Sequence, residues 1–335
     1  MNHLLNKLVE KQDLPIIEAE FLMEEILRGD LTNTQIASIL MALRMKRETT
    51  NEILGFIKVL RKHMIKIKTS GLIIDTCGTG GDGKGTFNIS TAVSLVVAGA
   101  GVKVAKHGNR AVSSECGSAD VLEALGVNIN QTPDSARRCL EERGFVFLFA
   151  PLFHPAFKNV VQARRELGIK TIFNYLGPFL NPAGVKRQLI GVSNYQMAEK
   201  LAEVATKLGY EHLLVVVSRD GLDEISLSEK SDVFEVRGRK VKKIVIDPHE
   251  FGFKSVSLDK FRGRDAKMNA QIINRILNGE KGARRDIVVL NSAAALYAAG
   301  KVKNIRQGIH IAQDAIDCGC AKKLLARVIN VSQRL

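Results

Sequence analysis

Tryptophan is absent from this 335-residue sequence, and only four tyrosines are present. Proteins that bind single-stranded nucleic acid stack bases on aromatic side chains, so the shortage disfavours that class. No apolar run approaches the roughly 18 residues of a membrane helix, and the N-terminal segment lacks the apolar stretch of a signal peptide. We therefore expect a cytoplasmic protein without a membrane partner.

Cysteine is also scarce. Its five residues are odd in number and lack C-x-x-C spacing, which predicts neither a zinc site nor a disulfide framework. Acidic residues are outnumbered, because 49 lysines and arginines accompany 35 aspartates and glutamates, for a formal net charge of +14. That charge suits nucleic acid, an anionic surface or a polyanionic small substrate. The basic residues form no long block, so a scattered solvated surface is the simplest interpretation.

The pattern of the sequence changes near residue 70. Before it, apolar residues recur at helical spacing, and capping boxes beginning at Thr32 and Thr49 each open an amphipathic run. After it, short β-branched runs alternate with helical segments, which is typical of a mostly parallel sheet covered on both faces. A turn at Gly238 within FEVRGRKVKKIVI predicts an antiparallel hairpin.

We predict an α/β fold with two domains. A small all-helical domain covers residues 1–67 and is joined by helices from about 155–185, and a larger α/β domain with a mostly parallel central sheet covers 68–335. The parallel strands are expected at 72–75, 102–106, 145–150, 188–192 and 213–218. The helices between them are expected to begin near Asn88, Ser118, Pro133, Pro155 and Asn194.

The segment 75–92, DTCGTGGDGKGTFNISTA, fits three kinds of phosphate-binding loop. Its glycines match the G-x-G-x-x-G of dinucleotide sites from Gly78, but the second strand ends in Lys-His where an acidic residue should hold the ribose. Gly83 and Lys84 also match a P-loop, yet Gly85 replaces the hydroxyl residue that binds magnesium there. The remaining interpretation is a loop for the diphosphate of an activated sugar.

A second polar segment, 106–114 (KHGNRAVSS), follows the next predicted strand. Ligands of α/β sheets gather at the carboxyl ends of strands, where backbone N–H groups and helix N-termini meet anions. The two segments together therefore predict a cradle for a highly charged phosphorylated sugar.

Six separated motifs carry a resemblance to a known family: GTGGD, TFNIST, KHGNR, GSADVLEALG, RRELGIKTIFNYLGPFLNPAG and GLDEIS. In this order, and over nearly the whole chain, they closely resemble the anthranilate phosphoribosyltransferases. The resemblance implies a nucleoside phosphorylase/phosphoribosyltransferase-like fold, a role in tryptophan biosynthesis and a homodimer. Pyrimidine nucleoside phosphorylases share the fold but carry a lysine-histidine-serine form of the first loop, where this chain has Asp75-Thr76-Cys77.

The implied reaction is attack of the anthranilate amine on C1 of phosphoribosyl diphosphate, with loss of diphosphate. It needs no covalent nucleophile, only orientation of two anions and neutralisation of the leaving group. By resemblance, the residues that contact phosphoribosyl diphosphate are Gly78, Gly81, Asp82, Thr86, Asn88, Ile89, Ser90, Thr91, Lys106, His107, Gly108, Asn109, Ser113, Ser114 and Ser118. For Ser113, Ser114 and Ser118, simple capping of the helix that follows is an alternative role.

The resemblance assigns anthranilate to Gly78, Asn109 and Arg164. Arginine suits the task because its planar fork holds a carboxylate through two charge-assisted hydrogen bonds. His107 is placed near the amine, although a packed or backbone-bonded histidine fits the sequence nearly as well.

The implied cofactor is Mg²⁺, two ions per monomer, held by Ser90, Asp223 and Glu224. Adjacent carboxylates at a strand end suit magnesium, which shares oxygen ligands with phosphates. A solvated acidic turn is the alternative.

Some positions depart from the family pattern. Arg47 stands where family members commonly have glycine, and Ala111, Glu115 and Cys116 differ beside the second segment. Glu115 adds a negative charge next to the expected anion cradle, which weighs against contacts there. The competing functions are a non-catalytic relative that binds nucleic acid through its basic surface, and a pyrimidine nucleoside phosphorylase. The intact GTGGD, Arg164 and DE set favours the transferase.

Overall fold

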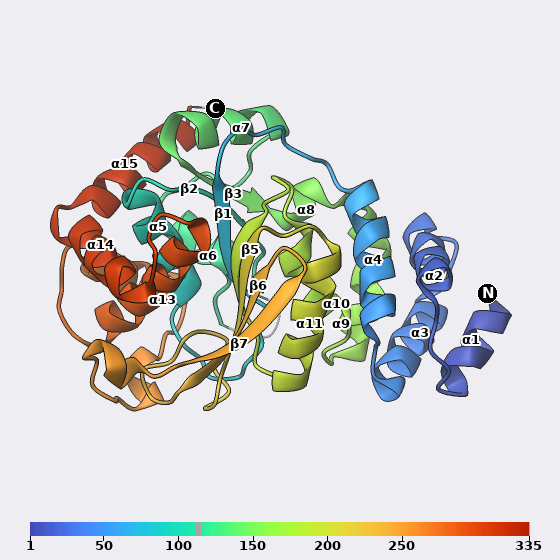
Figure 1. The fold of residues 1–335 in the computed structure, drawn as a ribbon. Coiled ribbons are helices and arrows are strands. Elements are labelled where there is room, and N and C mark those ends of the chain that lie inside the picture. Colours follow the sequence, from blue (N-terminus) through green and yellow to red (C-terminus); the bar gives the residue numbers. More distant parts are fainter. Residues whose placement is uncertain (112–114, 335) are drawn as a thin grey trace. The chain divides into compact units, whose positions relative to one another are not determined.

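Helices build one of the two units of the chain, and a seven-stranded sheet builds the other (Figure 1). The computed structural model describes residues 1–111 and 115–334. The helical unit comprises Met1–Ile65 with Pro151–Leu180, and the α/β unit comprises Lys66–Ala150 with Asn181–Leu335. None of the helices in the described part of the chain is long and apolar enough to cross a membrane.

The helical unit consists of four N-terminal helices and a returning segment. Its elements are α1 (Asn2–Val9), α2 (Ile16–Arg28), α3 (Asn33–Lys46), α4 (Thr50–His63), α8 (Ala150–Phe153), η1 (Pro155–Phe157), α9 (Lys158–Leu167), α10 (Phe173–Leu176) and η2 (Gly177–Leu180). Both predicted capping boxes are present, with Thr32 bonded to Gln35 at the start of α3 and Thr49 bonded to Glu52 at the start of α4.

Glu52 does more than cap α4. It is fully buried, and its Oε1 accepts the backbone N–H of Leu14 at 2.9 Å while its Oε2 lies 3.0 Å from Lys46 Nζ. Lys46 also pairs with Asp13 at 2.6 Å. Removing one partner of such a buried pair leaves an uncompensated charge and costs about 3–5 kcal/mol. The cluster fixes the α1–α2 connection against the α3–α4 turn.

Arg47, the departure noted in the sequence, ends α3 with a φ of +71°. A side chain at positive φ is strained, by about 1–3 kcal/mol, and glycine avoids that strain. The backbone at this turn therefore favours glycine over arginine.

The α/β unit confirms the predicted fold class. Its strands are β1 (Ile73–Gly78), β2 (Lys103–Gly108), β3 (Phe145–Phe149), β4 (Arg187–Gly191), β5 (His212–Ser218), β6 (Ser231–Arg237) and β7 (Lys240–Ile246). They lie in the order β3-β2-β1-β4-β5-β6-β7, parallel from β3 to β5 and antiparallel from β5 to β7. The β6–β7 hairpin turns at Gly238, with a φ of +59°, as predicted.

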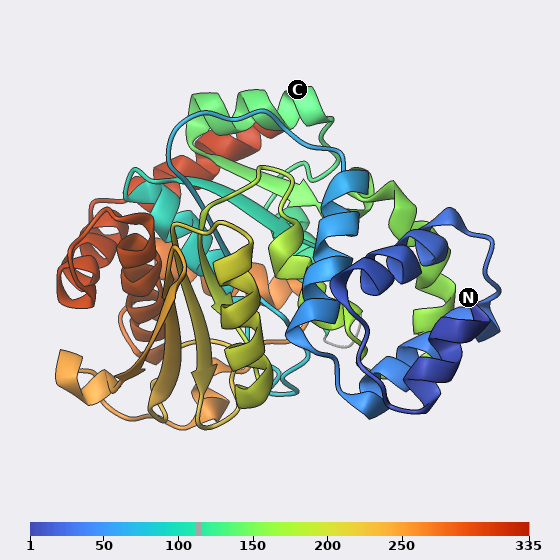
Figure 2. The ribbon, with the colours of Figure 1, turned by 45° about the vertical axis from the view of Figure 1, so that its right-hand side comes forward.

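The strand order reverses between β1 and β4. The chain runs outward from β1 to β2 and β3, and then outward from β4 to β5 on the other side. Because parallel crossovers are right-handed, α5 (Ile89–Gly99) and α11 (Tyr195–Lys207) lie on opposite faces. Figures 1 and 2 show α11 across the sheet from α5 and α13 (Ala283–Ala299). Ligands of such sheets bind at this switch point, outside the carboxyl ends of the strands.

The core of the unit lies mainly between the sheet and the helices α5 and α13. Most side chains of these two helices are buried. The remaining helical elements of the unit are α6 (Ser118–Ala124), α7 (Pro133–Arg143), η3 (Pro248–Phe251), η4 (Leu258–Phe261), α12 (Ala266–Leu277), α14 (Ile305–Asp317) and α15 (Cys320–Ser332). Cys318 and Cys320 form a disulfide between α14 and α15, a single pair where the number and spacing of the cysteines predicted no disulfide framework. Their C-x-C spacing differs from the C-x-x-C pattern on which that expectation was based.

Candidate functional site

Two glycines at the switch point let a third segment lie across the strand ends. Gly78 ends β1 and is in register with Gly191, which ends β4. A Cβ atom on Gly78 would overlap the Asp223 carboxylate, and one on Gly191 would overlap the Asp223 backbone carbonyl. The loop 219–224 after β5 therefore lies directly over β1 and β4, and it carries Asp223 and Glu224 to the edge of the sheet.

The glycine-rich loop after β1 is tied to the same segment. The backbone N–H of Gly80 donates to Asp223 Oδ2 at 2.9 Å, and that of Thr79 donates to the Gly191 carbonyl at 2.8 Å. Asp82 accepts the Lys84 N–H through Oδ1 at 3.1 Å. In the described part of the chain, Asp82 Oδ2 and Thr79 Oγ1 are buried without a hydrogen-bond partner. Buried polar atoms are normally satisfied, so these two oxygens are suited to bind a ligand.

Glu224 is buried at the N-terminus of α5, where it accepts the backbone N–H of Ser90. Burial raises the pKa of Glu224 well above its usual range, and the negative charges of Asp223 and Asp82 raise it further. The nearby ammonium of Lys106 opposes that rise. Three carboxylates thus lie close together at this edge with too little positive charge to balance them.

Lys106 is buried beneath this edge. Its Nζ donates to the Thr76 carbonyl at 2.6 Å and to Ser90 Oγ at 3.2 Å. Burial lowers the pKa of Lys106, although Asp75 opposes the shift. Both bonds hold the ammonium between β1 and the first turn of α5, facing the residues predicted to bind diphosphate.

Asp75 is a buried carboxylate whose structural role was not predicted. Its oxygens accept Asn181 Nδ2 at 2.8 Å, Gln188 Nε2 at 3.3 Å and the His107 N–H at 3.4 Å. Burial raises the pKa of Asp75 to about 6, and the Lys106 charge limits the rise. The network joins β1, β2 and β4 just below the site and fixes the backbone of His107.

The donor set at this edge fits magnesium. Asp82, Asp223 and Glu224 supply oxygen atoms, and Asp82 Oδ2 lacks a partner among the described residues. Within residues 1–111 and 115–334, no three His, Cys, Asp or Glu side chains enclose a metal ion by themselves. Mg²⁺ usually takes one or two carboxylates and completes its shell with phosphate oxygens and water. The residues therefore fit a metal that is shared with a phosphate ligand.

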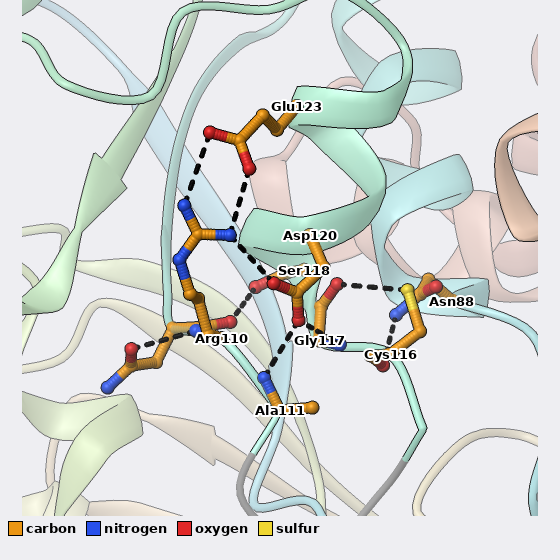
Figure 3. A network of polar contacts seen from close by, with 9 residues as sticks. Asn88, Arg110, Ala111, Cys116, Gly117, Ser118, Asp120 and Glu123 are labelled. Atoms are coloured by element: carbon orange, nitrogen blue, oxygen red, sulfur yellow. Dashed lines mark hydrogen bonds and ion pairs between the residues drawn. The ribbon is translucent and has the colours of Figure 1, made fainter. Parts of the chain in front are cut away.

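The loop after β2 is braced by ion pairs (Figure 3). Arg110 Nη1 lies 2.9 Å from Asp120 Oδ1 and 2.9 Å from Glu123 Oε2, so its charge is already paired. Asp120 Oδ2 also accepts the N–H groups of Ala111 and Gly117, each at 2.9 Å. Asp120 therefore closes the base of the loop, a role that was not predicted. The only signal for it in the sequence was an acidic residue three positions after Gly117.

The predicted contact residues of this region differ in availability. Asn109 is exposed, and its carbonyl accepts Ser118 Oγ at 3.3 Å, so Ser118 supports the Asn109 backbone. The side-chain amide of Asn88 already has two partners. Its Nδ2 donates to the Cys116 carbonyl at 3.1 Å, and its Oδ1 accepts a hydrogen bond from Asn269 Nδ2 at 2.9 Å. Ser113 and Ser114 lie outside the described residues.

The remaining predicted contacts lie on the glycine-rich loop, on β2 and on α5. Ile89 buries its side chain in the core, which leaves only its backbone for a ligand. The hydroxyl of Thr91 is buried and has no partner among the described residues. Gly81 and Thr86 are partly exposed, as is Gly108 at the end of β2.

Arg164 belongs to the other unit, on α9. It is partly buried, and its guanidinium lies over the Phe173 ring at 5.3 Å from the centroid. Burial lowers the pKa of Arg164. No carboxylate of the described residues forms an ion pair with it, whereas its neighbour Arg165 is exposed. A partly buried, unpaired guanidinium is suited to an anionic ligand.

Comparison with known proteins agrees with this geometry. Residues 2–64 match the glycosyl transferase family, helical bundle domain, and residues 70–322 match the glycosyl transferase family, a/b domain. The anthranilate phosphoribosyltransferase of Thermoanaerobacter sp. (strain X514) is 50% identical over 332 residues, 99% of this chain and 98% of that protein. That of Petrotoga mobilis is 47% identical over 335 residues, 100% of this chain and 97% of that protein.

Solved structures give the same result. Anthranilate phosphoribosyltransferase (TrpD) from Thermus thermophilus superposes with a TM-score of 0.92 at 38% identity, covering 98% of this chain and 99% of that one. The Saccharomyces cerevisiae enzyme in complex with PRPP and Mg gives a TM-score of 0.87 at 29% identity, covering 96% and 93%. The complex of the same yeast enzyme with 4-fluoroanthranilate gives a TM-score of 0.85 at 28% identity, covering 96% of this chain and 93% of that one.

The resemblance drawn from the six motifs is confirmed. It holds along nearly the full length of the sequence and for the whole fold. This chain belongs to the anthranilate phosphoribosyltransferase family.

Proposed function

We propose that this chain transfers the phosphoribosyl group of 5-phosphoribosyl 1-diphosphate to the amine of anthranilate, as a step of tryptophan biosynthesis. The products are N-(5-phosphoribosyl)anthranilate and diphosphate. The observation that carries the proposal is the pairing of a glycine-rich loop with Asp223 and Glu224 over the switch point of the sheet, in a chain of this family.

The bond between C1 and the diphosphate oxygen breaks with charge developing on the leaving group. Preorganised N–H groups and a fixed cation stabilise that charge. In this chain the N–H groups come from the glycine-rich loop, because those of the first turn of α5 are bonded within the chain, and the cation is Lys106. Asp75 and its partners Asn181 and Gln188 position these groups from below. No side chain forms a covalent intermediate.

Magnesium, when bound, supplies full positive charge to the diphosphate. The residues that would hold it are Asp223, Glu224 and Ser90, with two ions per monomer as the proposed number. Ser90 Oγ already accepts a hydrogen bond from Lys106 and retains lone-pair capacity for a second partner.

Anthranilate is held through its carboxylate by Arg164, with Gly78 and Asn109 as further contacts. The guanidinium supplies two parallel donors, and no carboxylate of the described residues pairs with it. His107 is fixed through its backbone by Asp75, and its proximity to the substrate amine stays a prediction.

We also propose that the chain is a homodimer located in the cytoplasm. Four large apolar side chains on α1, α2 and α3 are exposed: Val9, Ile17, Phe21 and Met45, between 48% and 80% of their surface. A partner subunit that covered these side chains would remove their apolar surface from water. Light scattering coupled to gel filtration tests the dimer, and a monomer mass would contradict it.

The test of the function is the loss of anthranilate fluorescence in the presence of phosphoribosyl diphosphate and magnesium. We expect turnover only when all three are present. The same preparation is titrated with single-stranded DNA over a range of salt concentrations. No turnover, with submicromolar DNA binding and a steep salt dependence, would instead support the non-catalytic nucleic-acid-binding relative. Phosphorolysis of a pyrimidine nucleoside would support the phosphorylase.

A further inference from the structure

Lys84 is a charged residue of the glycine-rich loop that no role yet accounts for. It lies between Gly83 and Gly85, which have φ values of +73° and +63°, and its backbone N–H is bonded to Asp82 at 3.1 Å. Its side chain crosses to the loop after β5. A Cβ atom built on Gly221 would lie 3.4 Å from Lys84 Cε and 3.5 Å from Nζ. These distances are ordinary van der Waals contacts, so the end of the Lys84 side chain lies directly beside Gly221.

Lys84 is half-buried as a residue, and its ammonium is unpaired in the described part of the chain. Among the described residues it has no ion pair and no hydrogen bond through Nζ. Asp220, which precedes Gly221 in the facing loop, does not pair with Lys84. Its carboxylate accepts Ser226 Oγ at 2.6 Å and the Leu222 N–H at 3.1 Å. An ammonium without a protein partner keeps its donors available, so this position suits an anionic ligand.

The place of Lys84 indicates which anion it meets. It lies where the loop of Asp82 contacts the loop of Asp223 and Glu224, which are the carboxylates suited to a phosphate-bound metal. Lys106 supplies a second positive charge next to this region, where its Nζ donates to Ser90 Oγ. A lysine presents three rotatable donors and a compact charge, which suits a tetrahedral phosphate group.

We propose that Lys84 binds the diphosphate group of phosphoribosyl diphosphate, and of the pyrophosphate product, and thereby joins the glycine-rich loop to the loop 219–224. The inference rests on the proposed function and adds a binding residue to that site. Lys84 is a substrate-binding residue, because its ammonium touches the leaving group.

The experiment compares the wild-type protein with Lys84→Met, Lys84→Arg and Lys103→Met. Lys103 begins β2, at the opposite end of that strand from the site, and donates to the Ser70 carbonyl at 3.4 Å, so it is a matched control of equal charge change. Binding of pyrophosphate with magnesium is measured by calorimetry, and KM is measured for both substrates. Thermal unfolding without ligand monitors the fold.

We expect Lys84→Met to weaken pyrophosphate binding and to raise KM for phosphoribosyl diphosphate by about tenfold each. KM for anthranilate and the melting temperature should stay within error. Lys84→Arg should retain most of the affinity, and Lys103→Met should match the wild type.

Unchanged pyrophosphate affinity in Lys84→Met would overturn the inference while leaving the function standing. So would an equal loss in Lys103→Met, or a rise in both KM values together with a fall in melting temperature, which would assign Lys84 to loop structure. A wild-type protein without turnover and without pyrophosphate binding would overturn the proposed function itself.

Discussion

Removing the guanidinium of Arg164 should affect one substrate and spare the other. The side chain is partly buried against the Phe173 ring, its pKa is lowered by burial, and no carboxylate among the described residues pairs with it. A charge-assisted hydrogen bond is worth about 1.5–3 kcal/mol. At about 1.4 kcal/mol per decade, Arg164→Ala should raise KM for anthranilate roughly 10- to 100-fold.

The assay measures anthranilate fluorescence at saturating phosphoribosyl diphosphate, and then with the two substrates exchanged. Arg165→Ala is the matched control, because Arg165 is the exposed neighbour on the same helix. Arg164→Lys keeps the charge but not the planar fork, so it should fall between the wild type and Arg164→Ala. Stability should change little, since loss of the ring contact is offset by relief of a partly buried charge.

Equal increases in KM for both substrates would show that Arg164 does not bind anthranilate. Such a result would mean that Arg164 supports the fold of the helical unit through Phe173, and a lowered melting temperature would accompany it. A loss as large in Arg165→Ala would also contradict the assignment, because it would show that only the charge of α9 matters.

Three further predictions concern the metal, the backbone and pH. Asp223→Asn combined with Glu224→Gln should lower kcat about 10²- to 10⁴-fold, or about 3–5 kcal/mol, with folding retained, and near-normal activity at low magnesium would contradict the metal role. Arg47→Gly should raise the free energy of unfolding by about 1 kcal/mol, because relief of strain at a φ of +71° exceeds the entropy that glycine adds to the unfolded chain; a lower melting temperature would argue otherwise. Burial lowers the pKa of His154 to about 4, so the unfolded chain, with a pKa of about 6.5, binds the proton first as pH falls. The contribution of this residue to the free energy of unfolding is therefore fully present above a pH of about 6.5, and it falls by about 3 kcal/mol towards a pH of about 4. Urea unfolding of His154→Gln, measured at both pH values, should lack that fall.

Much of the fold was predictable because its signals are local. The β-branched runs indicated all five parallel strands, and Gly238 indicated the hairpin turn. The capping boxes at Thr32 and Thr49 are formed as expected, since each needs only four consecutive residues. The strand–loop–helix setting of the glycine-rich loop was predictable for the same reason, because these three elements follow one another in the chain.

The features that the sequence did not reveal depend on packing between different elements. Glu52 was expected to cap α4, but its buried pair with Lys46 and its bond to Leu14 require packed helices. Arg110 was part of the expected anion cradle, yet Asp120 and Glu123 take its charge from the next helix. Charge alone does not reveal which cations are already paired.

Transfer of one phosphoribosyl group from diphosphate to the amine of anthranilate fixes the stoichiometry of the reaction. To measure it, the purified protein is mixed with anthranilate, phosphoribosyl diphosphate and magnesium, and anthranilate is followed by fluorescence and pyrophosphate by a coupled assay in the same sample. We expect one pyrophosphate released for each anthranilate consumed, and a product whose mass is that of anthranilate plus one phosphoribosyl group. Pyrophosphate release that is independent of anthranilate, or no consumption of anthranilate at all, would contradict the transfer.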